Sequence, residues 1–322
     1  MTYYPYTVPS TDGIHTLRGA VYLPEGQPVG VLHIIHGMTE YIGRYHKFMQ
    51  EMAASGWLVC GHDHLGHGQT ADPSEWGFIA PKDGWDILCR DAVAFGKAVC
   101  NEYEARFGPL PYVIMGHSMG SFVARLVAER YIQLDRRAAE RLAGLIIMGT
   151  GGPNPAAGAG IALSGIIKTL RGERHVSKLL YALAFGGYGK PFRAEGDIHS
   201  WLSTDPALRD AYRKDPLCMF PFTVSAMGDL IRLTKYANRK DWFKSIPDRL
   251  PILLVSGSED PVGGMGKGVG LVHEKLQKAG KDVTFHLYEG YRHEILNDFC
   301  YPQVAEDIRA FLANTIQTTK GE

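Results

Sequence analysis

Residues 112–120 read YVIMGHSMG, an apolar run that ends in a G-x-S-x-G motif centred on Ser118. A helical pattern over 119–130 follows the motif directly. A serine at such a strand-to-helix turn has a strained backbone, and side chains at the flanking glycines would collide with their surroundings. We therefore predict that Ser118 is a nucleophile exposed near a helix N-terminus, and not merely a serine that caps the helix.

Short apolar runs on both sides of this motif predict the rest of a sheet. They lie at 29–35, 57–60, 145–148, 252–255 and 283–287. Most do not alternate with polar residues, which is typical of strands covered on both faces. Helical patterns at 84–101 and 119–130 lie between them, and a third at 304–312 closes the chain. Strands that alternate with helices predict an α/β fold with a mostly parallel central sheet flanked by helices.

The alternation breaks between about residues 151 and 247. This stretch starts with the sequence TGGPNPAAGAG and then offers helical pieces at 161–170, 176–185 and 222–236, without a strong strand pattern. We predict a core domain made of residues 1–151 and 248–322. Residues 152–247 are predicted to form a helical cap inserted over the sheet, and we call them the cap segment.

The composition excludes several classes of protein. The 322 residues include 34 Lys and Arg against 34 Asp and Glu, which argues against nucleic acid as a partner and against a polybasic membrane anchor. With 45% hydrophobic residues the chain is not disordered. The N-terminal sequence MTYYPYTVPSTDG predicts no signal peptide, and no apolar run is long enough to predict a membrane span. Five widely spaced cysteines without a C-x-x-C motif favour reduced thiols in the cytoplasm.

A serine nucleophile needs a base, and the base needs an acid that orients it. In this kind of fold the chain order is Ser, then Asp or Glu, then His. The stretch PILLVSGSEDPV places Asp260 directly after a predicted strand, and the neighbouring Glu259 is the alternative acid. We predict that Asp260 holds the tautomer of the base and stabilises its imidazolium.

The candidate base is His293, in the loop of VTFHLYEGYRHEILND after the last predicted strand. His286 is its main competitor, but it lies inside the strand pattern. His199 and His273 are further candidates. His293 is predicted to take the proton of Ser118 and later to give it to the leaving group.

Acyl transfer also needs donors for the oxyanion. One is the backbone N–H of Met119, which follows the nucleophile. The run VLHIIHGM ends a predicted strand in His36-Gly37, so the N–H of Met38 is the predicted second donor. The competing reading is that Gly37 only terminates the strand.

Together these segments resemble the monoacylglycerol lipase and lysophospholipase branch of the α/β-hydrolases, which is also classed with serine aminopeptidase-like hydrolases. The resemblance covers residues 29–311 and rests on the motifs at 36–40, 44–45, 61–70, 116–120, 201–203, 215–218, 256–264 and 288–298. It implies an α/β-hydrolase fold, a triad of Ser118, Asp260 and His293, an oxyanion hole at Met38 and Met119, and a cap that shapes an acyl pocket. It also implies that Asp63 bonds backbone amides. Tyr41 departs from the histidine common in the lipase branch, which predicts different loop contacts near the pocket.

Two other motifs could indicate bound groups. The segment 62–67, HDHLGH, is rich in histidine, but it does not meet the metallohydrolase pattern H-x-H-x-D-H. The glycines of 263–270 give neither a Walker A motif, because Lys267 precedes a glycine, nor a dinucleotide fingerprint. We therefore expect no metal and no cofactor.

The sequence thus predicts a serine carboxylester hydrolase that acts on monoacylglycerols, lysophospholipids or similar small acyl esters. The first alternative is a peptidase or amidase with the same triad, in which Glu40 or an acid of the cap segment anchors a free amino group. The second is a non-catalytic ligand-binding module of the same fold. The apolar surface of 161–170 either packs on the core or touches lipid transiently.

Overall fold

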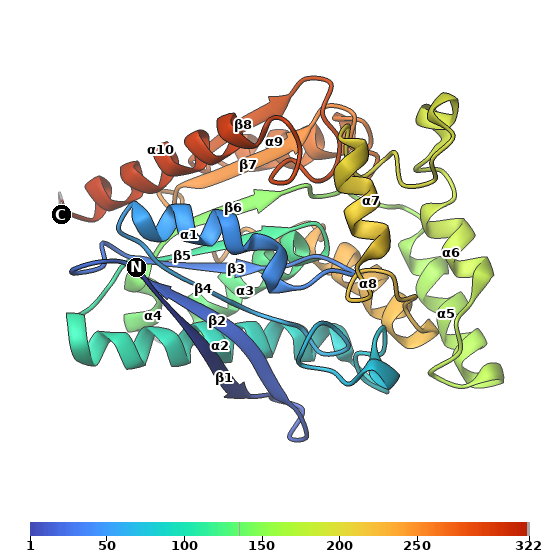
Figure 1. Cartoon of the computed structure of the whole chain (residues 1–322), viewed down its shortest axis with the longest axis horizontal. Helices are drawn as coiled ribbons and strands as arrows, with labels where there is room; N and C mark the ends of the chain where they lie inside the picture. The colour runs from blue at the N-terminus through green and yellow to red at the C-terminus, as the bar shows by residue number, and fades with distance from the viewer. Residues whose placement is uncertain (135, 321–322) are drawn as a thin grey trace.

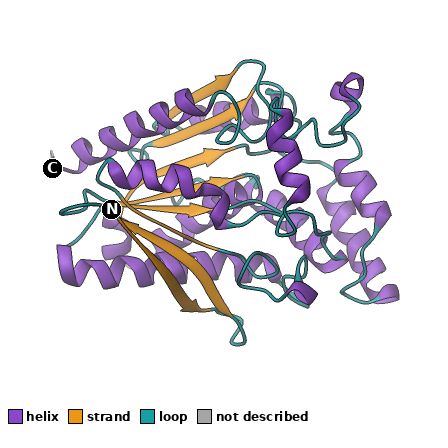
Figure 2. Cartoon of the chain, in the orientation of Figure 1, coloured by secondary structure: helices purple, strands orange, loops and turns teal. Residues whose placement is uncertain are grey.

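In the computed structural model, which describes residues 1–134 and 136–320, eight strands form one sheet (Figures 1 and 2). The strand order is β1-β2-β4-β3-β5-β6-β7-β8. The first two strands run antiparallel to their neighbours, and β3 to β8 are parallel. The strands are β1 (Thr2–Pro9), β2 (Thr16–Leu23), β3 (Val31–Ile35), β4 (Leu58–His62), β5 (Tyr112–His117), β6 (Leu142–Met148), β7 (Ile252–Gly257) and β8 (Val283–Tyr288). The predicted mostly parallel sheet is confirmed.

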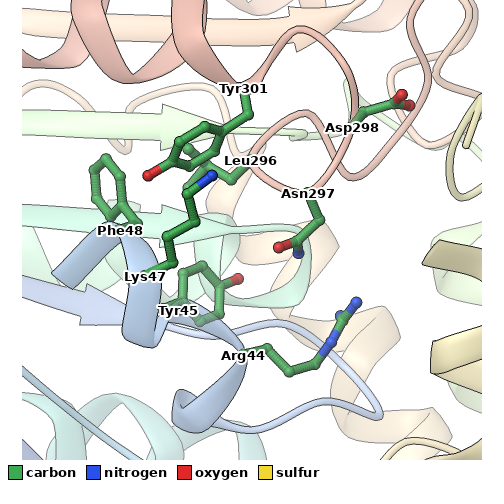
Figure 3. Close-up of a pocket in the computed structure, with 8 residues that line it drawn as sticks. All are labelled: Arg44, Tyr45, Lys47, Phe48, Leu296, Asn297, Asp298 and Tyr301. Carbon is green, nitrogen blue, oxygen red and sulfur yellow. The ribbon is translucent and has the colours of Figure 1, made fainter. Parts of the chain in front are cut away.

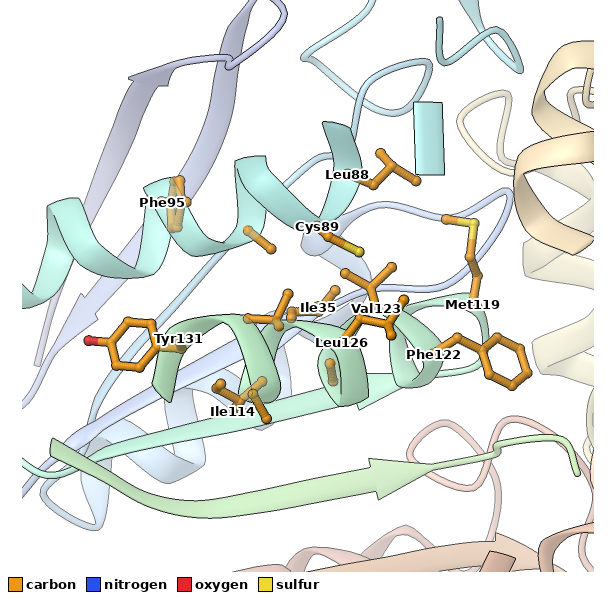
Figure 4. Close-up of a cluster of buried hydrophobic side chains, with 14 of the residues drawn as sticks. Ile35, Leu88, Cys89, Phe95, Ile114, Met119, Phe122, Val123, Leu126 and Tyr131 are labelled. Atoms are coloured by element: carbon orange, nitrogen blue, oxygen red, sulfur yellow. The ribbon is translucent and has the colours of Figure 1, made fainter. Parts of the chain in front are cut away.

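Helices cover both faces of this sheet, and each face has its own apolar core. One core joins the sheet to α2 (Gly84–Phe107), α3 (Met119–Leu134) and α9 (Lys267–Lys278); Figure 4 shows the part between α2 and α3. The other joins it to α1 (His46–Ala54) and α10 (Tyr301–Lys320). The short α4 (Arg136–Arg141) and the 3-10 turns η1 (Ile42–Tyr45), η2 (Pro73–Glu75) and η3 (Lys190–Glu195) complete the connections.

The cap segment contributes four helices between β6 and β7. They are α5 (Ala157–Arg171), α6 (Lys178–Phe185), α7 (Pro206–Lys214) and α8 (Val224–Ala237). In Figure 1, α5 and α6 lie beyond the carboxyl ends of the strands. Helix α8 packs between α5 and the core helices α2 and α3, and its buried apolar side chains belong to the same apolar cluster as the core. The division into domains at 152 and 247 stays a prediction.

The six strands expected from apolar runs are all present, but β1 and β2 were not predicted. Strand β1 is mostly exposed at the edge of the sheet and contains Pro5, so it lacks the apolar run that marks a buried strand. Helices α1, α4, α7 and α9 were also missed. Helix α7, PALRDAYRK, shows why: it is mostly polar and buries only Arg209.

The five cysteines are all free and buried. Burial raises the pKa of each thiol, to about 11 for Cys100 and about 12 for Cys89 and Cys300. Cys218, in the cap segment, is therefore a buried thiol of low reactivity. None of the described helices is both long and apolar enough to cross a membrane.

Candidate active site

Ser118 lies in the turn between β5 and α3, with a left-handed φ of 54°. This conformation is uncommon for a residue with a side chain, and it marks the strained turn that the motif predicts. The flanking glycines are required by space as well. A Cβ atom at Gly116 would overlap the carbonyl oxygen of Gly120, and one at Gly120 would overlap that of Ile35 in β3. The two glycines therefore let the nucleophile turn lie directly against the neighbouring strand.

Replacing Gly120 by alanine should destabilise the chain, because backbone atoms of β3 and α3 must separate to admit the methyl group. Overpacking of this kind costs about 1–3 kcal/mol, and it would also move Ser118. Urea unfolding and labelling of Ser118 by a fluorophosphonate probe measure both effects. Gly165→Ala in α5 is the matched control, since no atom lies within 4 Å of its Cβ position. Equal stability of Gly120→Ala and the parent would contradict this account of the turn.

The structure brings together the three side chains predicted as a triad. His293 Nε2 lies 2.8 Å from Ser118 Oγ, and His293 Nδ1 lies 2.9 Å from Asp260 Oδ2. Asp260 follows β7 and is fully buried, and His293 follows β8 with 3% of its surface exposed. The second oxygen of Asp260 accepts a hydrogen bond from the Val262 N–H at 2.8 Å, which fixes the orientation of the carboxylate. In this arrangement the imidazole can accept the serine proton while it donates to the carboxylate.

The competing acid and bases contact other groups. Glu259 lies 3.7 Å from the Nε atom of Arg292. The His286 side chain is 40% exposed on β8, with Asp307 3.9 Å away. His273 packs its ring on Phe285, and His199 lies 3.8 Å from Asp197 in the cap segment.

The two residues predicted to supply oxyanion donors flank the same turn. Met119 is the first residue of α3 and is buried. The loop that carries Met38 lies against Ser118, because a Cβ atom at the adjacent Gly37 would be 2.9 Å from the Ser118 Cβ. The role of the two amides remains a prediction.

A buried network of charged side chains lies next to the triad, and the sequence did not reveal it. Glu40 accepts hydrogen bonds from the Gly37 N–H at 2.5 Å and from the Tyr45 hydroxyl at 2.9 Å, and it pairs with Arg44 at 3.2 Å. Arg44 also binds Glu294 with two nitrogens, at 2.7 and 2.6 Å. The network therefore joins the loop of Met38 to the residue that follows His293.

His117, which precedes the nucleophile, connects to this network through both ring nitrogens. Nδ1 lies 3.1 Å from Glu40 Oε1, and Nε2 lies 3.2 Å from the carbonyl oxygen of His293. Burial opposes charge on both partners, but their mutual hydrogen bond and attraction raise the pKa of His117 and lower that of Glu40. Because Glu40 and the His293 carbonyl oxygen are both acceptors, this arrangement favours the imidazolium form of His117, which can donate from both ring nitrogens. Since these contacts use Glu40, it is not free to anchor a substrate amine.

The histidines of segment 62–67 pack with two histidines in and directly after β3, and the sequence did not predict this cluster. Its members are fully buried and contact one another through their rings; they are His33, His36, His62, His64 and His67. Burial lowers the pKa of all five, to about 3 for His33 and His64 and about 4 for His67. In the described part of the chain, no group of three or more His, Cys, Asp or Glu side chains is arranged to hold a metal.

Asp63 of the same segment accepts hydrogen bonds from the backbone N–H groups of Ile42 at 2.8 Å and Gln69 at 2.7 Å. This structural role is the one that the family resemblance implied. Tyr41, the departure from the family pattern, donates to Asp215 of the cap segment at 2.9 Å. The substitution therefore supports a contact between the core and the cap segment.

A cavity of about 200 Å³ adjoins the charged network (Figure 3). It is lined by Arg44, Tyr45, Lys47, Phe48, Leu296, Asn297, Asp298 and Tyr301. Arg44 binds Glu294, and the Tyr45 hydroxyl lies 3.0 Å from His117 Nδ1. The cavity therefore shares two of its lining residues with the network around the triad.

Two aromatic side chains of the cap segment lie above the base. The ring centroids of Trp201 and His293 lie 5.3 Å apart, and those of Tyr188 and Trp201 lie 5.2 Å apart. The centroid of the His117 ring lies 4.9 Å from that of His293. The imidazole of His293 is therefore enclosed between the nucleophile turn and the cap segment.

Comparisons with known proteins show the family and the fold of the chain. The chain is 26% identical over 331 residues to a monoacylglycerol lipase of Mycolicibacterium smegmatis, covering 95% of this chain and 99% of the relative. It is 28% identical over 316 residues to the monoglyceride lipase of Rattus norvegicus, covering 94% and 90%. A thermostable carboxyl esterase from Bacillus coagulans has a similar structure, with a TM-score of 0.89, 27% identity and coverage of 98% and 99%. The chain is thus an esterase- or lipase-like hydrolase with the α/β-hydrolase fold. The family described as serine aminopeptidase, S33, matches residues 26–299, and this protein belongs to it.

Proposed function

We propose that the protein is a serine carboxylester hydrolase that cleaves monoacylglycerols, lysophospholipids or similar small acyl esters through an acyl-enzyme. The observation that carries the proposal is the hydrogen-bonded chain from Ser118 through His293 to Asp260. It requires no cofactor, because the serine, the base and the amides together supply the nucleophile, the proton transfers and the oxyanion donors.

In the proposed mechanism, Ser118 Oγ attacks the ester carbonyl carbon while His293 Nε2 takes the hydroxyl proton. The N–H groups of Met38 and Met119 donate to the oxyanion of the tetrahedral intermediate. His293 then gives its proton to the departing alcohol, which leaves an acyl group on Ser118. A water molecule deprotonated by His293 frees the acid and restores the serine. Proton transfer of this kind contributes about 10²–10⁴-fold, and loss of one oxyanion donor costs about 10²–10³-fold.

The surface of the cap segment supports a lipid-like substrate. Helices α5 and α6 expose large apolar side chains, namely Ile166, Leu170, Leu179 and Leu183. Exposed basic residues, Arg171 and Lys178, lie on or beside the same helices. An apolar face bordered by basic residues suits the boundary of a membrane with anionic headgroups. We propose that α5 and α6 touch such a surface transiently while substrate enters.

Hydrolysis of a matched series of substrates tests the proposed function. Monoacylglycerols and lysophospholipids should be cleaved, aminoacyl-anilides should be cleaved poorly, and a fluorophosphonate should label the wild type but not Ser118→Ala. Cleavage of anilides alone would replace the proposal by the peptidase alternative. A wild type that is neither labelled nor active on short p-nitrophenyl esters would favour the non-catalytic ligand-binding module.

We further propose a cytoplasmic location. Five free, buried thiols suit a reducing compartment, in which disulfides rarely persist.

A further inference from the structure

The residue before the predicted base, Arg292, is bound almost entirely by the cap segment. Its NH1 atom lies 2.7 Å from the Ser200 carbonyl oxygen, 3.2 Å from that of Ser203, and 3.1 Å from Glu195 Oε2. Its NH2 atom donates to the other oxygen of Glu195. Only 8% of Arg292 is exposed, and its guanidinium lies 4.0 Å above the ring of Phe192. One arginine therefore holds a carboxylate, two carbonyls and an aromatic ring of one short stretch.

The same stretch, residues 192–203, contacts the base on its other sides. The ring of Trp201 packs on His293, and the Leu202 carbonyl oxygen accepts from the Glu294 N–H at 2.8 Å. Residues 292, 293 and 294 thus each contact residues 192–203. About ninety positions separate these two segments in the chain, so tertiary contacts such as these bring them together.

The stretch is itself fixed within the cap segment. Arg209 of α7 binds Asp197 at 2.9 Å, Glu195 at 3.1 Å and the Ser203 carbonyl oxygen at 2.7 Å. Arg209 therefore binds the Glu195 carboxylate and the Ser203 carbonyl oxygen, both of which Arg292 also binds. The planar guanidinium of Arg292 therefore binds several acceptors whose positions are already fixed. Such multiple hydrogen bonds define the position of the Arg292 backbone more closely than a single contact could.

We propose that Arg292 is a positioning residue. It fixes the backbone of His293 against residues 192–203, so that the base is aligned with Ser118 and Asp260 while this stretch packs against it. The inference rests on the proposed function, because alignment has a catalytic consequence only if His293 is the base. Arg292 itself touches neither Ser118 nor Asp260 in the contacts described. Arg292 therefore acts on catalysis indirectly, by fixing the backbone position of His293.

Arg292→Gln tests the proposal, with Arg213→Gln as the matched control. Arg213 also forms ion pairs within the cap segment, with Asp197 and Asp210, but it contacts no residue of the His293 loop in the described structure. A shift of about 1 Å in a catalytic group can cost about 10²-fold, so Arg292→Gln should lower kcat and the rate of fluorophosphonate labelling by about 10–100-fold. KM should change much less, and Arg213→Gln should resemble the wild type. Arg292→Lys, which keeps the charge but loses the fork, should fall between them.

A spectroscopic readout separates this inference from the proposed function. The downfield proton resonance of His293 Nδ1, shared with Asp260 and assigned by its loss in His293→Gln, reports alignment whether or not the chain hydrolyses esters. It should broaden or disappear in Arg292→Gln and persist in Arg213→Gln. If it persists unchanged in Arg292→Gln, with labelling within twofold of the wild type, the proposal is wrong. If Arg292→Gln does not fold, Glu195→Gln and Arg292→Lys supply the same comparison. A wild type with the resonance but without labelling would contradict the proposed function and leave the positioning role supported.

Discussion

Exchange of His293 for glutamine is expected to lower kcat on a short p-nitrophenyl ester by about 10⁶-fold, the loss seen when a serine hydrolase triad loses its base. Glutamine cannot take the proton of Ser118, whose Oγ lies 2.8 Å from His293 Nε2. Asp260→Asn should cost about 10⁴-fold, because an amide favours the wrong tautomer of the imidazole. Initial rates, corrected for the folded fraction, measure both losses.

The control is His286→Gln, because His286 was the competing candidate for the base and lies on an exposed part of β8. Its kcat should stay within about twofold of the wild type, as expected for a surface substitution. A large loss in His286→Gln together with a small loss in His293→Gln would overturn the assignment of the base.

The second large effect that we expect is a loss of stability at acidic pH. The five buried histidines titrate near pH 6.5 in the unfolded chain. Burial lowers the folded pKa to about 3 for His33 and His64 and to about 4 for His67, and it holds the pKa values of the other two histidines well below 6.5. Between those values the unfolded chain binds more protons, so the free energy of unfolding falls as the pH falls below 6.5. Above pH 6.5 the contribution of these histidines to the free energy of unfolding is fully retained.

Buried acids act in the opposite direction. Burial raises the pKa of Asp63 and Asp229 to about 6 and also raises that of Asp91, so these groups favour the folded chain as the pH falls. The histidines outnumber them, which leaves a net uptake of about two to three protons on unfolding between pH 6 and 4.5. We therefore expect a loss of about 3–4 kcal/mol per pH unit in this window. That is a large fraction of the roughly 5–15 kcal/mol that stabilises a typical domain.

Urea unfolding followed by circular dichroism at several pH values measures this slope. His62→Phe should reduce it by about 1.4 kcal/mol per pH unit, because it removes one of the titrating groups. Phenylalanine suits the site, since both nitrogens of His62 lack partners and its ring already stacks on Phe95 at 4.6 Å. His286→Gln should leave the slope unchanged. A stability that does not change between pH 6 and 4.5 would show that the histidines do not titrate as a buried cluster.

The features that sequence reasoning predicted share a local origin. The strand, the turn at Ser118 and the following helix are continuous in the chain, so their apolar pattern and glycines are visible together. Asp260 and His293 could be located because each follows a parallel strand, and parallel strands end at one edge of a sheet. The geometry of the site then follows from the order of the strands.

The missed features depend on contacts between distant segments. Arg292 and Glu195 are separated by 97 positions, and nothing near either residue marks the other as its partner. Glu40 and His117 lie in motifs that were recognised, but their ion pair forms only because β3 and β5 are neighbours. The histidines of segment 62–67 were considered as metal ligands, because spacing alone does not show that their rings pack together and against His33 and His36.

The burial of all five thiols has a practical consequence for measuring motion in this chain. Because burial raises their pKa values, the native cysteines should react slowly with thiol-directed dyes while the chain is folded. Two cysteines introduced at exposed positions, Leu183 on α6 and Gln277 on α9, would then take up the dyes selectively. Energy transfer between them would report the separation of the cap segment from the core in solution, without first removing any native cysteine.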